Sequence, residues 1–423
     1  MAKEVIRAPQ CPVSPFPQSL AIRTGELLWT SGLMATDYTA GIAPEAAVNP
    51  DLPNYGSPAI KRQTRYIYQC VEKILDAAGC GLDDLIRIEQ FFPDRSQTPY
   101  FFDIYRELPI QNRPATASVI VNHLEVPDAL VACDFISIVP ETDVQKIPFH
   151  TEKVPQPLAK YALAQQVGDL VILPGNTASD FKTGIAPEAR ANKTFWFESD
   201  ITKQTEFILK TREVVLGEMG INFKDVVMTQ VYLTDIRDFP AFEEVWLKHF
   251  PKEPPARTVI PVDGLAVEGS IVEISMIAVK PDGAYRKETI ETHRAPHPLT
   301  HEPQAVKAGP FLFFSGQMAV DEKGLAPVAQ VNPQLPYHAS SIKKQTEYIL
   351  KNIQAISEAA GGSLDCIVKR QAFHSDLREM LPSFEVWREA FPHDPPVSTT
   401  VGVDSPLAVP GCTILLSLIG YLG

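Results

Sequence analysis

The sequence repeats itself at an interval of 141 residues, and this periodicity limits the possible folds more than any other feature. A Gln-Thr pair recurs at Gln63, Gln204 and Gln345. A proline in NRPATASV, EPPARTVI and DPPVSTTV recurs at the same interval. A glycine turn (TSGLMATD, LPGNTASD, FSGQMAVD) and the motif GIAPEA, GIAPEA, GLAPVA recur in the same order at intervals of 140 to 143 residues. Four landmarks in the same order predict three domain-sized repeats over residues 1–145, 146–286 and 287–423.

Each repeat has the same predicted order of elements. Apolar runs that end at glycine, such as ELLWTSG, are typical of strands that close into turns. In 63–77 the apolar positions recur at steps of three and four, which predicts an amphipathic helix that ends at AAG. A second helix is predicted over 98–107, 239–250 and 381–391. The order β-β-α-β-α-β-β predicts an α+β fold in which two helices cover one face of a mixed sheet.

A sheet covered by helices on one face leaves its other face bare. Three copies can bury these faces against each other around a pseudo-threefold axis, as the subunits of a cyclic trimer do. We therefore predict a monomeric pseudo-trimer or a low-order homo-oligomer of it.

Composition restricts the partners. The 38 basic and 51 acidic residues give a net charge of −13, which disfavours nucleic acid and anionic lipid. The chain lacks an apolar stretch long enough to span a bilayer, and its six cysteines include no CxxC pair. These features predict a cytoplasmic protein with a small-molecule ligand and no membrane or nucleic-acid partner.

The landmarks, read together, resemble the RidA/YjgF family of enamine/imine deaminases. The second repeat carries the most specific match, PPARTVIPVDGL followed by IVEISMIAV. The resemblance extends over essentially the whole chain, with one match in each of the three repeats. It implies a chorismate-mutase-like α+β fold and three RidA-like units that form a fused trimer with ligand clefts between repeats.

The resemblance also implies catalytic residues. In the family, the arginine of PAR binds the substrate carboxylate, and a glutamate in the VEI strand positions the attacking water. These positions are Arg257 and Glu273 here. The first repeat has Thr116 and Ala132 in the same columns, and the third has Ser398 and Leu415. We therefore expect one principal site, at an inter-repeat cleft of the second repeat.

Other residues of the predicted site follow from the same comparison. They include the glycine turn, the aromatic position near the first strand and the backbone that follows the arginine. The predicted substrate-binding residues are Gly175, Asn176, Tyr161, Thr258, Val259 and His301. The second repeat departs from the family at Pro174, where the serine of the turn is missing. The asparagine expected on the second helix is also absent, and its columns hold Phe102, Glu243 and Phe384, which favour a larger or more aromatic ligand.

No cofactor is predicted. The sequence has no GxGxxG, P-loop or GxSxG motif. His293, His297 and His301 lie four residues apart, but the prolines between them prevent a regular helix, so this spacing does not predict a metal site.

Five polar positions have structural interpretations. Asp134 lies in an otherwise apolar strand and needs a partner, for which an interface arginine such as Arg87 or Arg370 is suitable. His374, at the end of a strand, is interpreted as a packed or rim histidine. The recurring aspartates are interpreted as turn caps; they are Asp94, Asp235 and Asp376.

The sequence therefore favours a hydrolase of the imine/enamine deaminase type that acts on a C–N bond of a small carboxylate. Two alternatives remain open. One is a hydrolase or lyase that acts on a ring carboxylate, as chorismatases do; the other is a non-catalytic carboxylate-binding module. Fold resemblance does not choose among them.

Overall fold

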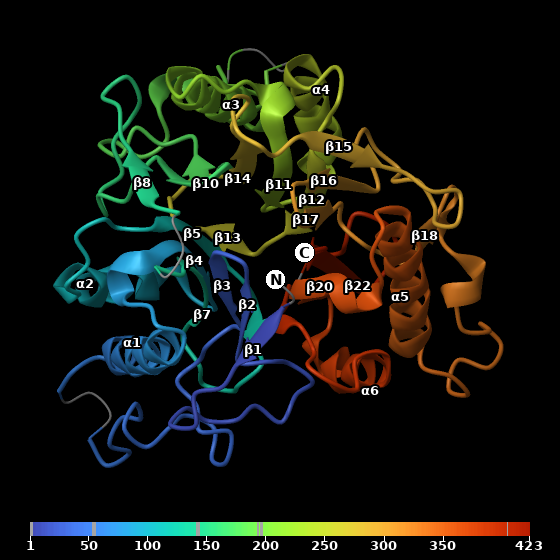
Figure 1. The fold of residues 1–423 in the computed structure, drawn as a ribbon, viewed down its shortest axis with the longest axis horizontal. Helices are drawn as coiled ribbons and strands as arrows, with labels where there is room; N and C mark the ends of the chain where they lie inside the picture. Colours follow the sequence, from blue (N-terminus) through green and yellow to red (C-terminus); the bar gives the residue numbers. More distant parts are fainter. Residues whose placement is uncertain (1–2, 53–55, 141–143, 193, 195–197, 404) are drawn as a thin grey trace.

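The computed structural model describes residues 3–423 except 53–55, 141–143, 193, 195–197 and 404. Three similar α+β units surround a common centre, and each places its pair of helices on the outside (Figure 1). The predicted α+β pseudo-trimer is confirmed.

The units share one order of main elements. The first contains β1 Glu4–Ile6, β2 Ala21–Thr24, β3 Leu27–Thr30, α1 Ala59–Ala77, β4 Leu85–Phe92, α2 Thr98–Glu107, β5 Ala115–Ile120, β6 His123–Leu124 and β7 Ala132–Ile138. The second contains β8 Lys146–Phe149, β9 Ala164–Val167, β10 Leu170–Thr177, α3 Asp200–Glu218, β11 Val226–Leu233, α4 Phe239–His249, β12 Ala256–Pro261, β13 Gly264–Leu265 and β14 Val272–Val279. The third contains β15 Lys287–Ile290, β16 Ala305–Ala308, β17 Phe311–Phe314, β18 Val320–Asp321, β19 Gly324–Leu325, α5 Ser341–Ala359, β20 Ile367–His374, α6 Met380–Ala390, β21 Val397–Gly402 and β22 Ile414–Tyr421.

Each sheet is mixed. The strand between the two helices pairs in parallel with the strand after the second helix (β4 with β5, β11 with β12, β20 with β21), and the other pairs in the three sheets are antiparallel. Short strands also cross between repeats. Strand β13 of the second repeat extends the first sheet, and β6 of the first repeat extends the third sheet. The three repeats are thus joined by backbone hydrogen bonds as well as by side-chain packing.

The repeated glutamine of the first long helix has a structural role. Gln63 donates to the carbonyl of Asp128 at 3.0 Å and accepts from the N–H of Leu130 at 2.8 Å. Gln204 and Gln345 make the same pair of bonds to their own loops. A buried amide thus satisfies the loop before the last long strand in every repeat, which explains the recurrence.

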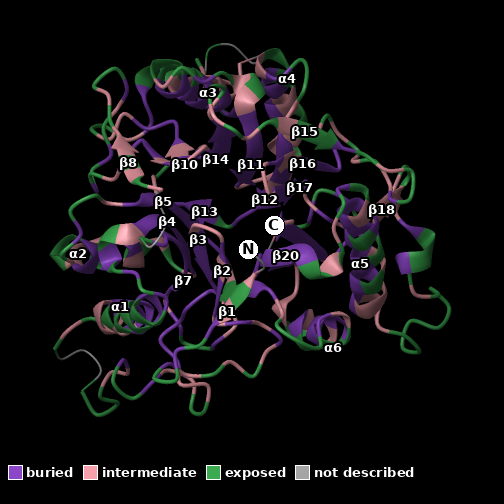
Figure 2. Cartoon of the chain, in the orientation of Figure 1, coloured by how far each residue is buried: buried purple, intermediate pink, exposed green. Residues whose placement is uncertain are grey.

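The core has two kinds of region. Each unit has its own apolar cluster between sheet and helices, and two further clusters contain residues from all three units. One shared cluster includes Trp29, Val227 and Phe313, which come from the first, second and third repeats. The strands are mostly buried, and exposed positions concentrate on the outer helices and loops (Figure 2). The helix-free faces of the three sheets therefore bury each other, as the repeat pattern predicted.

Residues from one sequence column meet at the axis. Gln230 donates to Gln371 Oε1 at 2.6 Å, and Gln371 donates to Glu89 Oε2 at 2.7 Å. These three residues are spaced 141 apart. Equivalent positions converge only about a threefold axis, so this contact chain identifies the pseudo-symmetry directly.

The predicted partner of Asp134 was wrong. Its carboxylate pairs with Lys369 at 2.7 Å and accepts from Gln371 at 2.9 Å, both of the third repeat. Arg87 pairs instead with Glu89 at 2.6 Å. The expected arginines lie at other positions because Asp134 faces the axis, where the third repeat presents a lysine.

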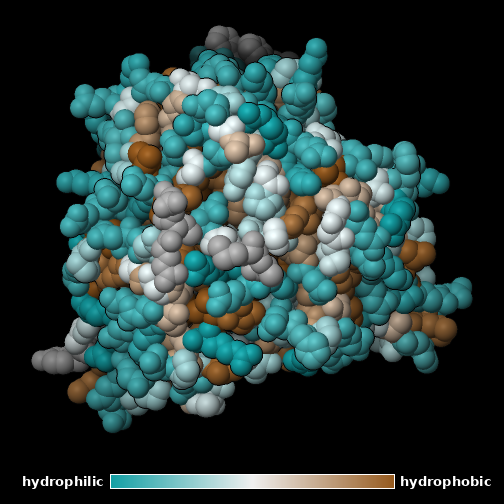
Figure 3. Space-filling model, viewed as in Figure 1, coloured by the Kyte–Doolittle hydropathy of each residue, from teal (hydrophilic) through white to brown (hydrophobic). Residues whose placement is uncertain are grey.

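The outer surface matches the acidic composition. Hydrophilic residues dominate the face shown in Figure 3, with apolar residues in small scattered areas. Among the residues that the structure describes, none of the helices has both the length and the apolar character needed to span a bilayer.

Candidate active site

The three repeats meet at three equivalent junctions. In each, the glycine turn of one repeat lies against the strand that follows the proline landmark in the preceding repeat. An added Cβ atom would lie 2.8 Å from Thr399 Cγ2 at Gly32, 3.1 Å from Ala117 Cβ at Gly175, and 3.2 Å from Thr258 Cγ2 at Gly316. We name them junction 1–2 (β5 against Gly175), junction 2–3 (β12 against Gly316) and junction 3–1 (β21 against Gly32).

The structure places Arg257 and Glu273 in different junctions. Both belong to the sheet of the second repeat, but β12 and β14 lie on opposite sides of β11. Arg257 stacks over Trp246 of α4, 4.9 Å from the ring centre, on the helix face. The neighbours of Glu273 along β14, Val272 and Ile274, pack in the helix-side core, so Glu273 faces the axis. The single cleft expected to hold both residues is therefore corrected.

At junction 2–3, Arg257 is already neutralised by carboxylates. Its Nη1 donates to Glu243 at 2.5 Å, and its Nη2 donates to Glu243 at 3.1 Å and to Glu302 of the third repeat at 2.7 Å. The guanidinium is fully buried. Two carboxylates thus occupy the positions that a substrate carboxylate would take.

The other residues predicted with Arg257 also lie at junction 2–3. Thr258 is buried and contacts Gly316, and Val259 packs on the helix-side core. His301 is exposed, next to Glu302. None of the three lies at the junction that contains Glu273.

At junction 1–2, the buried acid Glu273 lies between the backbone of Gly175 in its own repeat and the backbone of Ser118 in the first repeat. A Cβ atom on Gly175 would overlap its carboxylate, so a larger residue in the turn would displace the acid from this position. The backbone N–H of Ser118, from the first repeat, donates to the same carboxylate. Burial raises the pKa of Glu273 to about 8, opposed by the positive charges of Arg212 and Arg87. An acid with this pKa exchanges protons readily near neutral pH.

An arginine other than Arg257 lies at junction 1–2. Arg212 of α3 reaches the sheet where β10 bulges at Pro174 and Gly175, and it donates to the carbonyls of Pro174 and Ile274. It is 2% exposed, and its Nε has no hydrogen-bond partner. Among the described residues, no carboxylate forms an ion pair with it. Arg212 is therefore a buried cation with unused donor capacity beside Glu273.

Three further polar groups surround this pair. The hydroxyl of Tyr161 is hydrogen-bonded to Thr116 of the first repeat. Burial raises the pKa of Tyr161, so its hydroxyl stays protonated at neutral pH. The amide nitrogen of Asn176 is buried without a partner. Of the predicted residues, Gly175, Asn176, Tyr161 and Glu273 thus lie together.

Sequence comparison alone missed Arg212. The same helical position holds Val71 in the first repeat and Ile353 in the third, both buried. A charged residue at an apolar core position in only one of three repeats was the signal that could have identified it.

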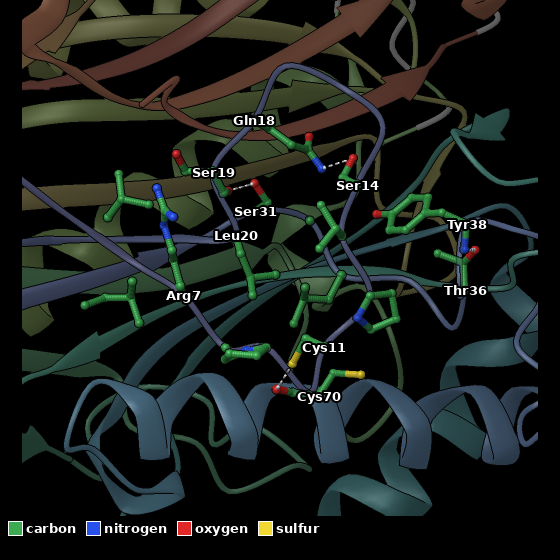
Figure 4. Close-up of a pocket in the computed structure, with 18 of the residues that line it drawn as sticks. Arg7, Cys11, Ser14, Gln18, Ser19, Leu20, Ser31, Thr36, Tyr38 and Cys70 are labelled. Carbon is green, nitrogen blue, oxygen red and sulfur yellow. Dashed lines mark hydrogen bonds between the residues drawn. The ribbon is translucent and has the colours of Figure 1, made fainter. Parts of the chain in front are cut away.

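Junction 3–1 differs in character. Phe16 of the first repeat stacks with Phe384 of α6, their ring centres 5.1 Å apart. Near it, a cavity of 440 Å³ lies between the N-terminal segment, the Ser31–Met34 turn and α1 (Figure 4). Its lining is mostly apolar, and its two charged lining residues, Arg7 and Asp394, are both exposed. This cavity contains no acid comparable to Glu273.

The structure describes residues 3–423 apart from the gaps given above. No group of three or more His, Cys, Asp and Glu side chains there is arranged to hold a metal ion. His297 pairs with Glu291 at 2.8 Å.

Fold and junctions together define a class of protein: three trimer-forming α+β domains fused into one chain, with polar sites where consecutive repeats meet. The family model described as Endoribonuclease L-PSP matches residues 7–139, 151–280 and 292–410. The chain therefore belongs to this family, as a tandem triple fusion of RidA-family domains.

Known relatives each correspond to about one repeat. A RutC family protein of Saccharolobus solfataricus is 35% identical over 130 residues, which cover 31% of this chain and 94% of the relative. The 3-aminoacrylate deaminase RutC of Acinetobacter baylyi is 32% identical over 127 residues, covering 30% of this chain and 92% of that protein. The family thus includes a protein named as a 3-aminoacrylate deaminase.

One solved structure resembles the whole assembly. The crystal structure of a chorismatase matches with a TM-score of 0.52 at 11% identity, covering 80% of this chain and 93% of that chain. At this identity the likeness concerns the fold alone.

Proposed function

We propose that this protein is a hydrolase that deaminates an imine or enamine of a small carboxylate at junction 1–2. The observation that carries the proposal is Glu273, a buried acid with a pKa of about 8, beside the buried and unpaired Arg212. The deaminase named among its relatives supports the same reaction class.

In this proposal Arg212 binds the substrate carboxylate, the role that the family resemblance implied for Arg257. Its guanidinium donates to the carbonyls of Pro174 and Ile274 at the bulge in β10, its charge lowers the pKa of Glu273, and it lacks an ion-pair partner among the described residues. A substrate carboxylate supplies that partner and is oriented by it. The unpartnered amide of Asn176 and the hydroxyl of Tyr161 are the groups available to the rest of the substrate.

Glu273 then performs the proton transfers. At neutral pH its carboxyl group is mostly protonated and donates its proton to the imine nitrogen. The resulting carboxylate accepts a proton from the water that attacks the iminium carbon, and it returns that proton to the nitrogen of the carbinolamine. As the C–N bond breaks and the ammonia or amine leaves, Glu273 accepts the hydroxyl proton, so that a neutral carbonyl compound forms and the acid is protonated again. An enamine enters the same sequence after protonation at carbon.

The net charge of −13 disfavours RNA as a substrate, although the description of the family model names an endoribonuclease. A polyanion would approach an acidic surface against electrostatic repulsion.

The test uses an amino-acid oxidase that generates imino acids in situ, with keto-acid and ammonia release as the readout. We expect the wild-type protein to accelerate release. Glu273→Gln should lower kcat/KM by roughly 10²–10⁴-fold, because the variant cannot transfer protons. Arg212→Met should raise KM by roughly 10–100-fold for carboxylate imines and leave neutral imines unaffected.

Glu302→Gln is the matched control, since it changes a partly buried carboxylate at junction 2–3 in the same way. Its kcat/KM should equal that of the wild type. If the wild-type protein accelerates none of a panel of imines of different side-chain sizes, the deaminase proposal fails. If Glu302→Gln is as harmful as Glu273→Gln, the assignment to junction 1–2 fails.

A further inference from the structure

Two of the six cysteines lie together at the wall of the 440 Å³ cavity in the first repeat. Cys11, in the N-terminal segment, and Cys70, on α1, both line this cavity, and each is 5% exposed. Cys11 Sγ lies 3.5 Å from the carbonyl oxygen of Cys70 (Figure 4). The two thiols are therefore neighbours at a surface that a small molecule in the cavity would contact.

The two thiols are also linked electrostatically. A hydrogen bond from the Cys70 thiol lowers the pKa of Cys11 below its usual range; burial opposes this shift, and the positive charge of Lys73 adds to it. Near neutral pH, a larger share of Cys11 is therefore thiolate than of an ordinary cysteine. The thiolate is the form of cysteine that reacts with oxidants.

The other cysteines do not share these features. All six are described by the structure, and Cys80, Cys133, Cys366 and Cys412 do not line this cavity. Burial raises the pKa of Cys133, Cys366 and Cys412. The thiols of these three residues stay protonated at neutral pH and serve as small core groups.

The thiol pair occurs in the first repeat alone. The corresponding positions hold no sulfur in the other repeats: they are Val154 and Thr211 in the second, and Ala295 and Asn352 in the third. Val154 and Ala295 are buried and precede a proline, as Cys11 does. An apolar side chain therefore satisfies the packing at this position, and packing alone does not explain two adjacent thiols.

The segment that carries Cys11 can approach α1 more easily than the helix can move. Cys11 lies outside the helices and strands, after a turn in which its N–H donates to the carbonyl of Ala8 at 2.9 Å. Cys70 lies in the middle of α1. A disulfide requires a distance of about 2.05 Å between the sulfurs. The cavity beside Cys11 gives its side chain the space for the rotation that brings the sulfurs together.

The lining of the cavity favours an apolar oxidant. Val5, Leu20, Leu33 and Met34 contribute to it, and its volume lies within the range of pockets that hold small organic molecules. A hydroperoxide with an alkyl or aryl group gains free energy when that group leaves water, whereas hydrogen peroxide has no such group.

We propose that Cys11 and Cys70 form an oxidation site, at which a small apolar hydroperoxide converts the two thiols to a disulfide. The Cys11 thiolate attacks the terminal oxygen of the hydroperoxide, and the O–O bond breaks. The alkoxide leaves as an alcohol with the proton that the Cys11 thiol released, and Cys11 becomes a sulfenic acid. The Cys70 thiolate then attacks the Cys11 sulfur, the S–O bond breaks, and hydroxide leaves as water with the proton of Cys70.

The surroundings of Cys70 suit it to the second step. In the reduced protein, the hydrogen bond to Cys11 and burial raise the pKa of Cys70, while Lys73 and the hydroxyl of Tyr66 favour its thiolate. Oxidation of Cys11 removes the first of these influences and leaves Lys73 and Tyr66 in place. Cys11 is therefore the attacking thiol and Cys70 the resolving one. The site shares no residue with junction 1–2 and is independent of the proposed deaminase reaction.

The test treats the reduced wild-type protein with an equimolar amount of cumene hydroperoxide. Peptide mapping without reductant should show a Cys11–Cys70 link within one chain, which dithiothreitol reverses. Cys412→Ser is the matched control, because Cys412 is also 5% exposed but its pKa is raised. It should form the link at the wild-type rate. Absence of the link, or oxidation of Cys412 as fast as Cys11 in the wild type, would overturn the proposal.

Two variants that carry residues of the second repeat separate the two steps. Cys70→Thr should stop at a sulfenic acid on Cys11, which dimedone captures. In Cys11→Val, the Cys70 thiol should be lost at least about tenfold more slowly than in the wild type. Loss of the Cys70 thiol at the wild-type rate in Cys11→Val, or no captured sulfenic acid in Cys70→Thr, would contradict the assigned order.

The class of oxidant is tested with hydrogen peroxide. The rate with cumene hydroperoxide divided by the rate with hydrogen peroxide should be at least about tenfold higher for the folded protein than for free cysteine, because burial of the aromatic group favours the larger oxidant. Unfolding in urea should remove the difference. Equal ratios for the folded protein and free cysteine would overturn the role of the cavity.

Discussion

The second repeat retains both an arginine and a glutamate at the family positions, and they lie at different junctions. The two junctions differ in how these charged groups are paired. At junction 2–3, Arg257 is paired with two carboxylates, Glu243 and Glu302. At junction 1–2, Glu273 is a buried acid with a raised pKa, and Arg212 beside it is unpaired among the described residues. The arginine of one junction is thus paired with carboxylates, whereas the arginine of the other has no ion-pair partner among the described residues.

This difference follows from the geometry of the threefold arrangement. The arginine column of one repeat faces the glutamate column of the next, so a repeat contributes its two polar residues to two different junctions. In a homotrimer every junction has both. In a fused chain each column changes separately, and retention of both residues within one repeat does not keep them together.

Arg257→Met should give the largest stability effect and distinguishes a structural from a catalytic arginine. It leaves Glu243 and Glu302 partly buried without a cation, which typically costs about 3–5 kcal/mol. Urea denaturation should show this loss, while kcat/KM per folded molecule stays at the wild-type value.

The control is Arg237→Met, which breaks an exposed pair with Asp235 in the same repeat and should leave stability nearly unchanged. Adding Glu302→Gln to Arg257→Met should recover part of the loss. A large fall in kcat/KM for folded Arg257→Met would instead return the carboxylate anchor to junction 2–3.

The pH dependence of stability tests the raised pKa of Glu273 at junction 1–2. Because the folded-state pKa of Glu273, about 8, lies above its ordinary value of 4.5, the folded protein binds more protons than the unfolded chain between these values. Stability contributed by this group therefore falls as pH rises through that window. When the pH rises from about 6 to about 9, the ionisation of Glu273 should lower the free energy of unfolding by roughly 2–3 kcal/mol.

Urea titrations of the wild type and Glu273→Gln at both pH values check this. The variant lacks the titrating group, so its stability should change less over the interval than that of the wild type. Equal changes in the two proteins would mean that Glu273 titrates with an ordinary pKa, and its role as acid and base near neutral pH would be lost.

The fold could be predicted from the sequence because the signals recur three times. Helix periodicity, the glycine turn and the proline landmark appear once in every repeat and in the same order, so an error in one copy is corrected by the others. The burial of the helix-free sheet faces could be predicted too, because a sheet with helices on one side must bury its other face against another part of the protein.

The candidate site was only partly predictable, for two physical reasons. Assigning Arg257 and Glu273 to one cleft ignored that β11 lies between their strands and that the two side chains leave opposite faces of the sheet. Arg212 belongs to no family motif. It becomes visible only when the three repeats are compared column by column and a charge is found where the others have Val71 and Ile353.

The recurring aspartates give the smallest expected effect and show what a purely structural column looks like. Asp94, Asp235 and Asp376 each accept from the backbone N–H two residues on, at 2.8, 2.9 and 3.0 Å, which confirms the turn caps. Since the three backbone bonds are alike and the additional Asp376–Arg378 ion pair is exposed, Asp94→Ala and Asp376→Ala should lower Tm by similar amounts, at most about 4 °C, with no change in kcat/KM. Differential scanning calorimetry and the imine assay measure both. The arginine and glutamate columns differ among repeats, and their effects should differ in the same way. A much larger loss of Tm for one of these two variants would contradict this comparison. It would mean that residues shared by the repeats can still differ in role.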